Sequence, residues 1–573
     1  MIEREEKRPG KALDIYVSGK RQQAVWSWGI FCSVIAYIVC IGMVIAPLER
    51  RLGATFLASL PLSRWVAKLG AWLPANFHWL PNAQDSFVST NNLEFLFIIA
   101  LAFVLYGLAT LLLLRLPPDA NYKGIQRLIW ATIIVAGLLL VFAPTMLSRD
   151  LFVYADYGHT LVTYHTNLYF VPPVKVSHDQ ITQFDDWNIS TAAYGPLWLY
   201  ISALVALIAG NAPLAYILAF RLLGLGAHLV NTWLILRMLQ MSGRSQRIVT
   251  LGMLLYALNP LALLESSMGA HNDTVMVTFI LSGILLCLRA ERRGFITFTS
   301  YAPPTIAFTL AMLIKFTSFP LLLFFLALVA CKSIYASALR FDWQVWRTAL
   351  LKVSLAGLLC ATIILLFYAP FWIGHSPVAI LASFSAPPSA SQAENSVLRA
   401  AQGLVHVADL SMRNSWWYGI VVLLSNHLTW VILDLIVLAS CMLFGIIRLW
   451  HSPMVHTLTL VALVTLGALL LVTPWFFAWY VIWLVALAAV LLVKPGGNPG
   501  QYALIAFALA FSASAFFSYQ VNGLPLLSNA GFLACLRIFG IPGLVFLSVF
   551  FLVQRPLAHM YAGRSALNGK SSS

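Results

Sequence analysis

The stretch RLIWATIIVAGLLLVFAPTM at residues 127–146, followed at once by LSRDLFVYADYGH at 147–159, decides the fold class of this chain. The first part is an apolar run of about 20 residues, the length that an α-helix needs to cross a hydrocarbon core about 30 Å thick. The second part places Asp150, Asp156 and His159 directly behind that run. Together they predict a membrane span with ionisable side chains at its mouth.

The composition extends this prediction to the whole chain. Of its 573 residues, 60% are hydrophobic and 10% are charged, whereas soluble domains average about 25% charged residues. Apolar runs of roughly 18 to 23 residues recur along most of the sequence. We expect one transmembrane domain over residues 24–553, with cytoplasmic tails at 1–23 and 554–573.

Three features exclude other classes of protein. No small-residue cleavage motif follows the first apolar run, so we expect a retained span and not a signal peptide. The seven cysteines fall within or at the ends of apolar runs, which predicts neither disulfides nor a thiolate metal cluster. The net charge of +15 comes from basic residues in short loops between spans, so we expect no nucleic-acid partner.

The number of crossings depends on one ambiguous run, YGPLWLYISALVALIAG at 194–210. If it crossed the membrane, the basic loops at 237–247 and 289–293 would lie outside. If it is an interfacial or re-entrant helix and the N-terminus is inside, most of the 35 Lys and Arg residues are cytoplasmic, as the positive-inside rule requires. We therefore predict about 14 crossings with both termini inside. The candidate spans are roughly 24–46, 93–115, 127–146, 214–240, 248–268, 272–290, 303–314, 318–331, 351–372, 429–449, 455–473, 476–493, 501–519 and 534–553.

This topology places four polar or aromatic features on the outer face. They are the catalytic candidate loop 147–213, GAHND at 269–273, a second long loop at 373–427, and TPWFFAWY at 473–480. Irregular polar backbone at membrane depth is tolerated only where protein buries it or where it lines a cavity. We therefore expect an outward-facing cavity, with the 373–427 loop as a candidate lid.

Asp150 is the strongest candidate for a catalytic group. It follows the end of its span by about one helical turn, near the depth where lipid headgroups begin. A carboxylate there is partly desolvated, which raises its basicity and suits a general base. The alternative is an interfacial pair of Arg149 and Asp150 that only ends the helix.

The remainder of the 147–213 loop is rich in Tyr, Trp, Asn and Pro. This mixture can stack on sugar rings and hydrogen-bond to hydroxyl groups, but it is also common at membrane interfaces. The acidic and histidine residues that could hold a divalent metal ion are His159, His165, His178, Asp179, Asp185 and Asp186. Their spacing matches no known metal-binding pair, so we assign no metal ligand and keep a divalent metal as an alternative.

Ionisable residues within or beside the later spans are further candidates, because such groups are costly in a membrane. In GAHND, one polar side chain could cap a helix that begins at Thr274, but capping gives no role to His271. Lys315 lies inside an apolar run that also contains Pro320, which predicts two short helices with the lysine at their outer break. There it could hold a lipid phosphate or reach the surface. Arg221 and Glu265 could pair.

Five motifs carry a resemblance to a known family. SRDLFVYADYGH, NLYFVPP, TAAYGPLW, LNPLALLESSMGAHNDTVMV and PWFFAWYVIWL occur in this order between about residues 127 and 490. They resemble the polyprenol-phosphate-mannose-dependent α-1,6-mannosyltransferases, membrane glycosyltransferases of the GT-C class. The resemblance implies an all-α polytopic GT-C-like fold with interfacial helices in the loop 147–213.

The resemblance also implies roles for individual residues. Asp150 falls on the family's catalytic aspartate, and Asp156 is our second choice. Arg149 and Lys315 are expected to bind the donor phosphate. The residues expected to contact substrate are Tyr154, His159, Tyr169, Tyr194, His271, Asn272, Asp273, Trp475 and Trp479.

The implied reaction moves a sugar, named by the resemblance as mannose, from a polyprenyl-phosphate donor to a glycan or glycolipid acceptor. A polyprenyl phosphate leaves without a general acid, so one base, Asp150, suffices for a single inverting displacement. We expect no organic cofactor and an active site on the extracytoplasmic face of a bacterial plasma membrane. The alternatives are a GT-C transferase for another sugar, for lipid A or for protein, and a secondary transporter or lipid flippase, which would bind near the bilayer midplane in two related halves.

Overall fold

The computed structural model of the chain describes residues 9–44, 93–143, 146–295, 297–335, 342–385, 427–472, 476–492, 498–521 and 536–553. Within these ranges every regular element is a helix, and eleven helices are long and apolar enough to cross a membrane. The chain is therefore an all-α polytopic membrane protein, as its composition predicts.

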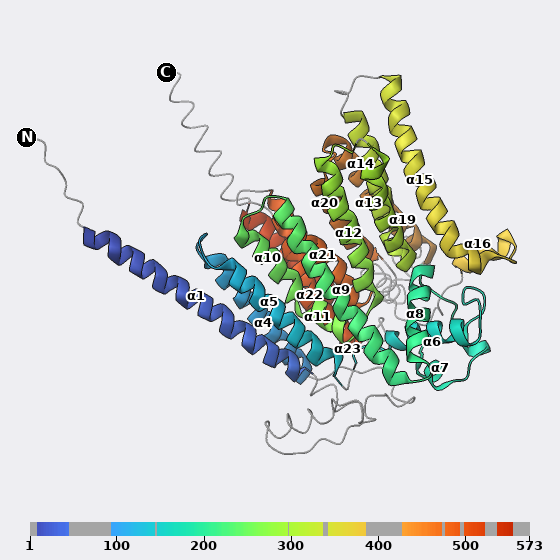
Figure 1. Cartoon of the computed structure of the whole chain (residues 1–573), viewed down its shortest axis with the longest axis horizontal. Helices are drawn as coiled ribbons and strands as arrows, with labels where there is room; N and C mark the ends of the chain where they lie inside the picture. The colour runs from blue at the N-terminus through green and yellow to red at the C-terminus, as the bar shows by residue number, and fades with distance from the viewer. Residues whose placement is uncertain are drawn as a thin grey trace, which may run out of the picture.

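The long helices form an elongated bundle (Figure 1). They are α1 (Pro9–Met43), α4 (Leu93–Arg115), α5 (Tyr122–Val141), α9 (Pro213–Met241), α12 (Asn272–Arg292), α14 (Phe319–Tyr335), α15 (Trp343–Trp372), α19 (His427–His451), α20 (Val455–Val472), α22 (Pro499–Ser514) and a last helix over Leu536–Val553. Three other predicted runs contain shorter pieces, namely α10 (Gln246–Ala257) with α11 (Pro260–Ser267), α13 (Phe298–Ile314), and the 3₁₀ turn Ala478–Val481 with α21 (Ile482–Val490). Each predicted span thus coincides with a helix or a pair of helices.

The bundle has an enclosed axis and an exposed rim. In α12 and α20, 67% and 72% of the most apolar stretch is buried, whereas in α15 and α19 only 11% is buried. The rim helices expose large apolar side chains such as Leu358, Leu366 and Leu443, as expected where a helix meets lipid tails. The polar GAHND turn therefore leads into one of the best-enclosed helices of the described chain.

Two breaks in the apolar runs bring polar residues to the same region. Between α10 and α11 the chain bends by 51° at Asn259, whose side-chain oxygen caps α11 by accepting from the Ala262 amide at 3.1 Å. Pro260 suits this first turn because its missing N–H is not needed there. Between α13 and α14, Lys315 is extended, which confirms the break predicted at this lysine.

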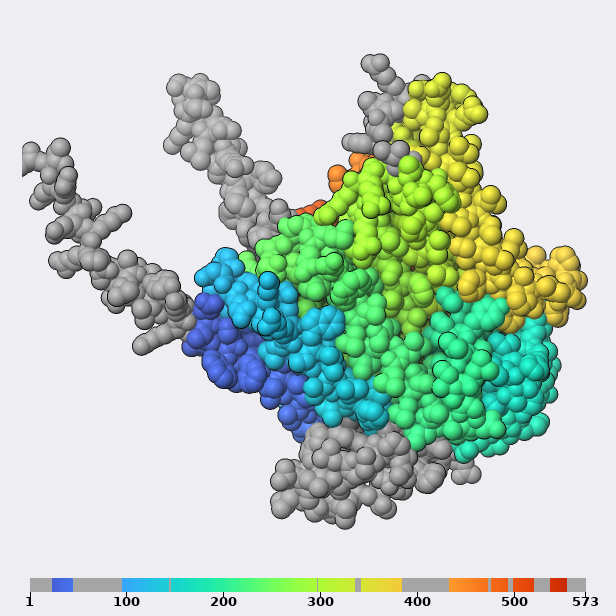
Figure 2. Space-filling model, in the orientation of Figure 1, coloured from blue at the N-terminus to red at the C-terminus, as the bar shows by residue number. Residues whose placement is uncertain are grey.

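The 147–213 loop folds into a helical cap at one end of the bundle. It contains α6 (Asp150–Thr163), a 3₁₀ turn (Pro173–Lys175), α7 (Gln180–Phe184) and α8 (Pro196–Ala209), seen in teal and green in Figures 1 and 2. The 14 residues of α8 span about 21 Å, too short to cross a core of about 30 Å. An interfacial position of this run agrees with the predicted topology.

Contacts tie this cap to the rest of the bundle at two points. The Asn167 side chain donates to the Phe371 carbonyl at 2.6 Å, and the Phe170 ring stacks on His375 at 3.7 Å, close to α16 (Pro377–Ser385). The Gly195 amide donates to the Ile314 carbonyl, and a Cβ at this position would lie 2.1 Å from the Leu313 carbonyl oxygen. Only glycine allows the cap to approach the end of α13 this closely.

Candidate active site

The first turn of α6 brings the predicted base Asp150 to the wall of a cavity. Its carboxylate accepts a hydrogen bond from the Ser148 hydroxyl at 3.1 Å, and its side chain is 14% exposed. Val153 and Tyr157 lie about one and two turns further along the helix and line the same cavity. One face of α6 therefore presents a carboxylate to a space of about 210 Å³.

The other walls of the cavity come from segments far apart in the sequence. They include Trp187, Tyr194, Lys315, Phe316, Phe477 and Tyr480. The cavity thus combines one carboxylate, one ammonium group and several aromatic rings. Aromatic faces favour stacking against the apolar face of a ligand, and the ammonium favours an anion.

The GAHND turn places His271 directly behind the Asp150 carboxylate. The His271 Nδ1 atom lies 3.7 Å from Asp150 Oδ2, and its Nε2 atom lies 3.3 Å from Glu265 Oε2. The ring stacks on Trp479 with 3.8 Å between centroids. Ala270, just before the histidine, has a φ of 56°, a left-handed backbone that non-glycine residues adopt at a cost and that is often found at functional sites.

Lys315 is held beside the cavity by Asp273. Its Nζ atom donates to both Asp273 carboxylate oxygens, at 2.9 and 3.0 Å, and it lies 4.0 Å from the centre of the Tyr480 ring. The Trp483 indole N–H also donates to Asp273, at 2.7 Å. This arrangement neutralises a fully buried carboxylate and leaves one of the three ammonium N–H donors of Lys315 outside the ion pair.

The electrostatic surroundings of Asp150 suit a proton acceptor. Burial raises the pKa of the Asp150 carboxyl above its ordinary value, while the nearby His271 and Lys315 oppose that rise. The carboxylate is thereby more basic than a solvated aspartate but has positive groups that favour its ionised form. This balance is what a general base near neutral pH requires.

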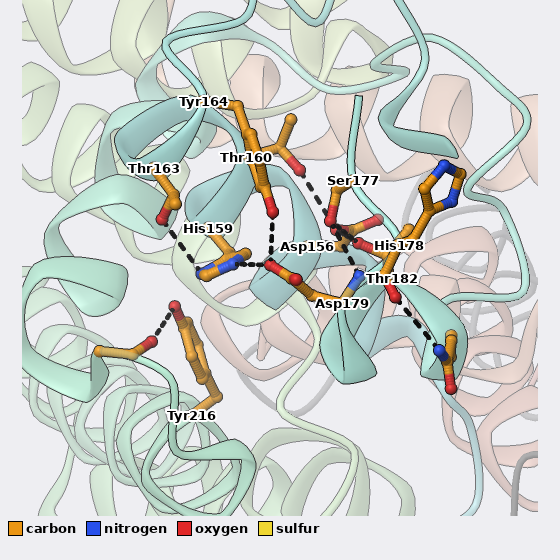
Figure 3. A network of polar contacts seen from close by, with 12 residues as sticks. Asp156, His159, Thr160, Thr163, Tyr164, Ser177, His178, Asp179, Thr182 and Tyr216 are labelled. Carbon is orange, nitrogen blue, oxygen red and sulfur yellow. Dashed lines mark hydrogen bonds and ion pairs between the residues drawn. The ribbon is translucent and has the colours of Figure 1, made fainter. Parts of the chain in front are cut away.

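The opposite face of α6 carries a second polar network, shown in Figure 3. Asp156 is buried and accepts hydrogen bonds from the hydroxyls of Thr160, at 3.2 Å, and Thr182, at 2.6 Å. Asp185 is also buried, close to Asp156. Burial raises the pKa of both carboxyls, and the repulsion from Asp156 raises that of Asp185 further.

His159 belongs to this second network. Its Nε2 atom lies 2.7 Å from Asp179 Oδ2, which also accepts from the Tyr164 hydroxyl at 2.9 Å. These contacts hold the loop around α7 against α6. Because residue 187 and its neighbours belong to the same loop and line the cavity, this network supports the cavity wall from behind.

Comparison with known proteins adds a family to this geometry. Residues 50–332 match the model of the alpha-(1->6)-mannopyranosyltransferase N-terminal domain family. The matched residues include α6, the GAHND turn and Lys315. The match covers just under half of the chain and supports the family that the motifs indicate. The motifs that carried the resemblance in the sequence therefore lie largely inside the matched region.

Individual relatives are more distant. The chain is 28% identical to alpha-(1->6)-mannopyranosyltransferase A of Corynebacterium glutamicum over 30% of this chain and 34% of that protein. It is 29% identical to alpha-(1->6)-mannopyranosyltransferase A of Mycobacterium tuberculosis over 28% of this chain and 30% of that protein. The chain thus spans about a third of the length of these relatives. No solved structure matches it significantly.

The predicted site residues of the family motifs fall into three groups. Asp150, Tyr194 and Lys315 line the cavity. His271, Trp479 and Asp273 lie directly behind them, as described above. Asn272 is fully buried beside them, and neither atom of its side-chain amide has a hydrogen-bond partner.

Other predicted residues have structural contacts. Arg149, predicted to bind phosphate, forms an ion pair with Asp186 at 3.1 Å. Tyr154 is buried against Trp198 and Tyr194, and the Tyr169 hydroxyl donates to the Tyr194 carbonyl at 2.8 Å. Trp475 lies outside the described residues.

The divalent metal that was kept as an alternative finds no support in the described ranges. There, no three His, Cys, Asp or Glu side chains are arranged to hold a metal ion. His159 and Asp179 instead pair with each other. We therefore derive no step through a metal.

Some residues of the site could not be assigned in advance. The sequence offered Glu265 and Arg221 as a possible pair. In the structure Arg221 donates to the Met268 carbonyl at 3.0 Å and to the Ala143 carbonyl at 2.6 Å, and Glu265 contacts His271 and Tyr519. Sequence distance does not reveal such partners. A helical period does place residue 157 on the same face as residue 150, so this signal could have identified that cavity residue.

Proposed function

We propose that the protein is a membrane glycosyltransferase that moves mannose from a polyprenyl-phosphate donor to a hydroxyl group of a glycan or glycolipid acceptor. The reaction takes place at the extracytoplasmic face of a bacterial plasma membrane and inverts the anomeric centre. The observation that carries this proposal is the Asp150 carboxylate on the wall of an aromatic cavity that also contains Lys315. Similarity to the alpha-(1->6)-mannopyranosyltransferases supports mannose as the sugar.

Asp150 acts as the general base. The acceptor hydroxyl is a poor nucleophile, and its proton passes to the Asp150 carboxylate as its oxygen bonds to the anomeric carbon. The bond from that carbon to the phosphate oxygen breaks, and the electron pair leaves with the phosphate. No general acid is needed because a polyprenyl phosphate is already a weakly basic leaving group.

Lys315 stabilises the negative charge that grows on the departing phosphate. Its ammonium group is desolvated, and Asp273 and the Tyr480 ring fix its position. Fixed charges of this kind act strongly in a site from which water is excluded. A donor that stays in the membrane also explains why the catalytic residues lie at the end of a helical bundle and not in a soluble domain.

The cavity suits one sugar ring. Its volume of about 210 Å³ lies below the about 300–1,000 Å³ of pockets for drug-sized ligands. Trp187, Tyr194 and Tyr480 supply aromatic surfaces for the apolar face of the sugar. Because α6, which carries Asp150, lies in the helical cap at one end of the bundle (Figure 1), the arrangement favours a transferase over a transporter, which would bind near the bilayer midplane.

The test is transfer of labelled mannose from polyprenyl phosphomannose to a short α-mannoside by the purified protein in detergent. Wild type and Asp150→Asn are compared, with size-exclusion elution confirming that both are folded. We expect the variant to lose about 10²-fold or more in turnover. Transfer from another polyprenyl-phosphate sugar alone would overturn the choice of mannose, and full activity of Asp150→Asn would overturn the assigned base.

A further inference from the structure

The histidine behind Asp150 is clamped between two carboxylates. Its Nδ1 atom faces Asp150 at 3.7 Å, and its Nε2 atom faces Glu265 at 3.3 Å. Glu265 and His271 are both fully buried, and the second oxygen of Glu265 accepts the Tyr519 hydroxyl. The chain of contacts therefore runs from the cavity through the imidazole ring to a carboxylate deep in the bundle.

The protonation that fits this arrangement has hydrogens on both ring nitrogens. A neutral imidazole carries one N–H and one lone pair, so one carboxylate would face a lone pair. An imidazolium offers an N–H to each carboxylate. Neither ring nitrogen has a hydrogen-bond partner among the described residues, and these two carboxylates are the charged groups that face it.

The charge balance of the site points the same way. Asp150, Glu265 and Asp273 are three carboxyl groups within one enclosed cluster, and Lys315 is the ammonium group paired with them. With His271 neutral, three carboxylates would face two positive groups, Lys315 and Arg221, whose guanidinium donates to the Met268 carbonyl beside the turn. Excess buried charge of one sign is costly, and an imidazolium reduces it. Other titratable groups near Asp150 are the hydroxyls of Tyr154, Tyr157, Tyr194, Tyr480 and Tyr519.

The backbone of the 269–273 turn packs closely against Glu265 and His271. A Cβ at Gly269 would lie 2.7 Å from Glu265 Oε2 and 2.7 Å from His271 Cδ2. Ala270 then adopts its left-handed conformation, and Trp479 covers the histidine ring. The ring is thus fixed in position and cannot turn away without disturbing several neighbours.

Resting on the function proposed above, we infer that His271, held by Glu265, is a positioning residue that keeps the general base Asp150 ionised and oriented toward the acceptor. The imidazolium stabilises the carboxylate before the reaction. The acceptor proton then moves to Asp150 and leaves through the cavity. Glu265 acts one step further back, since its negative charge stabilises the imidazolium.

The experiment measures the protonation of Asp150 with and without the clamp, that is, the contacts of His271 with Asp150 and Glu265. A hydrophobic carbodiimide modifies protonated carboxyl groups, and mass spectrometry measures its addition to Asp150 as a function of pH. The proteins compared in detergent are wild type, His271→Asn and Glu265→Gln, and transfer rates are measured across the same pH range. His159→Asn is the matched control, because it removes a histidine–carboxylate pair on the opposite face of α6.

We expect the labelling midpoint of Asp150 to rise by about one pH unit in both clamp variants. His271→Asn removes the imidazolium beside the carboxylate, and Glu265→Gln removes the carboxylate that keeps that imidazolium protonated. The pKa that limits kcat/KM on the acid side rises by the same amount. Below this pKa the variants lose about 10-fold in kcat/KM, and at higher pH they regain the wild-type value. The control leaves the midpoint in place. Glu265→Gln keeps the shape of the buried side chain, so the test does not depend on the histidine variant folding.

An unchanged labelling midpoint in both clamp variants, with a rate that falls equally at every pH, would overturn the inference and leave only a structural role. Labelling does not depend on sugar transfer. A raised midpoint in variants of a protein whose wild type transfers no sugar would therefore support the clamp and refute the proposed reaction.

Discussion

The two faces of α6 use the same residue types for different purposes. On one face, Asp150 lies beside His271 and opens to a cavity; on the other, Asp156 lies in a network with Asp185 that includes His159. Asp156 is buried and accepts hydrogen bonds from two threonine hydroxyls, whereas Asp150 accepts one from the Ser148 hydroxyl and lines the cavity. An aspartate with a nearby histidine is therefore no catalytic signature by itself. Access to the cavity distinguishes the two.

The largest expected difference between the faces is in stability. Asp156→Ala leaves the buried hydroxyls of Thr160 and Thr182 without this acceptor. We expect a loss of about 2–4 kcal/mol and a Tm lower by several degrees, measured by thermal unfolding in detergent. Asp150→Ala, on the open face, should lower Tm much less. Equal losses from both variants would contradict the distinction between the faces.

A smaller effect is expected on the open face from Gly269→Ala. The added methyl group pushes Glu265 and His271 apart, because it would lie 2.7 Å from each. A displacement near 1 Å at a catalytic group lowers the rate substantially, so we expect kcat/KM to fall about 10-fold or more. Steady-state transfer assays measure the change, with Gly226→Ala as the control because a Cβ there meets nothing within 4 Å. A Gly269→Ala variant as active as this control would argue against a fixed clamp.

The acid pair on the closed face predicts a dependence on pH. The pKa values of Asp156 and Asp185 are raised in the folded protein, so the pair stabilises the fold below their unfolded values near 4 and loses this contribution as pH rises through the folded values. Asp185→Asn removes one of the two charges. We expect the free energy of unfolding to fall less steeply with rising pH than in wild type, by up to about 1.4 kcal/mol per pH unit, as followed by Tm across the pH range. Parallel Tm profiles for variant and wild type would count against this coupling.

The smallest effect is expected at the surface of the closed face. His159→Asn removes the ion pair with Asp179, whose side chain is 43% exposed. Hydrogen bonds from His159 and Tyr164 lower the pKa of Asp179, so this contribution is present above the ordinary value and is lost as pH falls. Solvent screens such a pair, and we expect less than about 1 kcal/mol. A larger decrease in thermal stability would mean that this histidine does more than hold the loop.

Much of the fold was predictable from the sequence because lipid imposes simple rules. Spans must be long and apolar, and a proline with a lysine inside one of them predicts the break seen at Lys315. The 51° bend at Asn259 was missed although Asn259-Pro260 is a turn signal, because the run around it is as apolar as a straight span.

The candidate site was predictable in outline but not in its contacts. Asp150, His271 and Lys315 were each identified separately, as ionisable residues inside or at the ends of apolar runs. Their mutual distances depend on how α6, α11 and α13 pack, which neither spacing nor composition encodes. For the same reason the contacts of Glu265 with His271 and Tyr519 could not be foreseen, and Asp156 could not be separated from Asp150 until their surroundings were known.

The central claim is that only the open face of α6 carries the base. The most direct test measures mannose transfer per folded molecule for Asp150→Asn and Asp156→Asn side by side, at a temperature well below both Tm values. We predict that Asp150→Asn falls about 10²-fold or more, while Asp156→Asn retains at least about a tenth of the wild-type rate. A folded Asp156→Asn that is inactive, beside an active Asp150→Asn, would contradict the account and move the base to the other face.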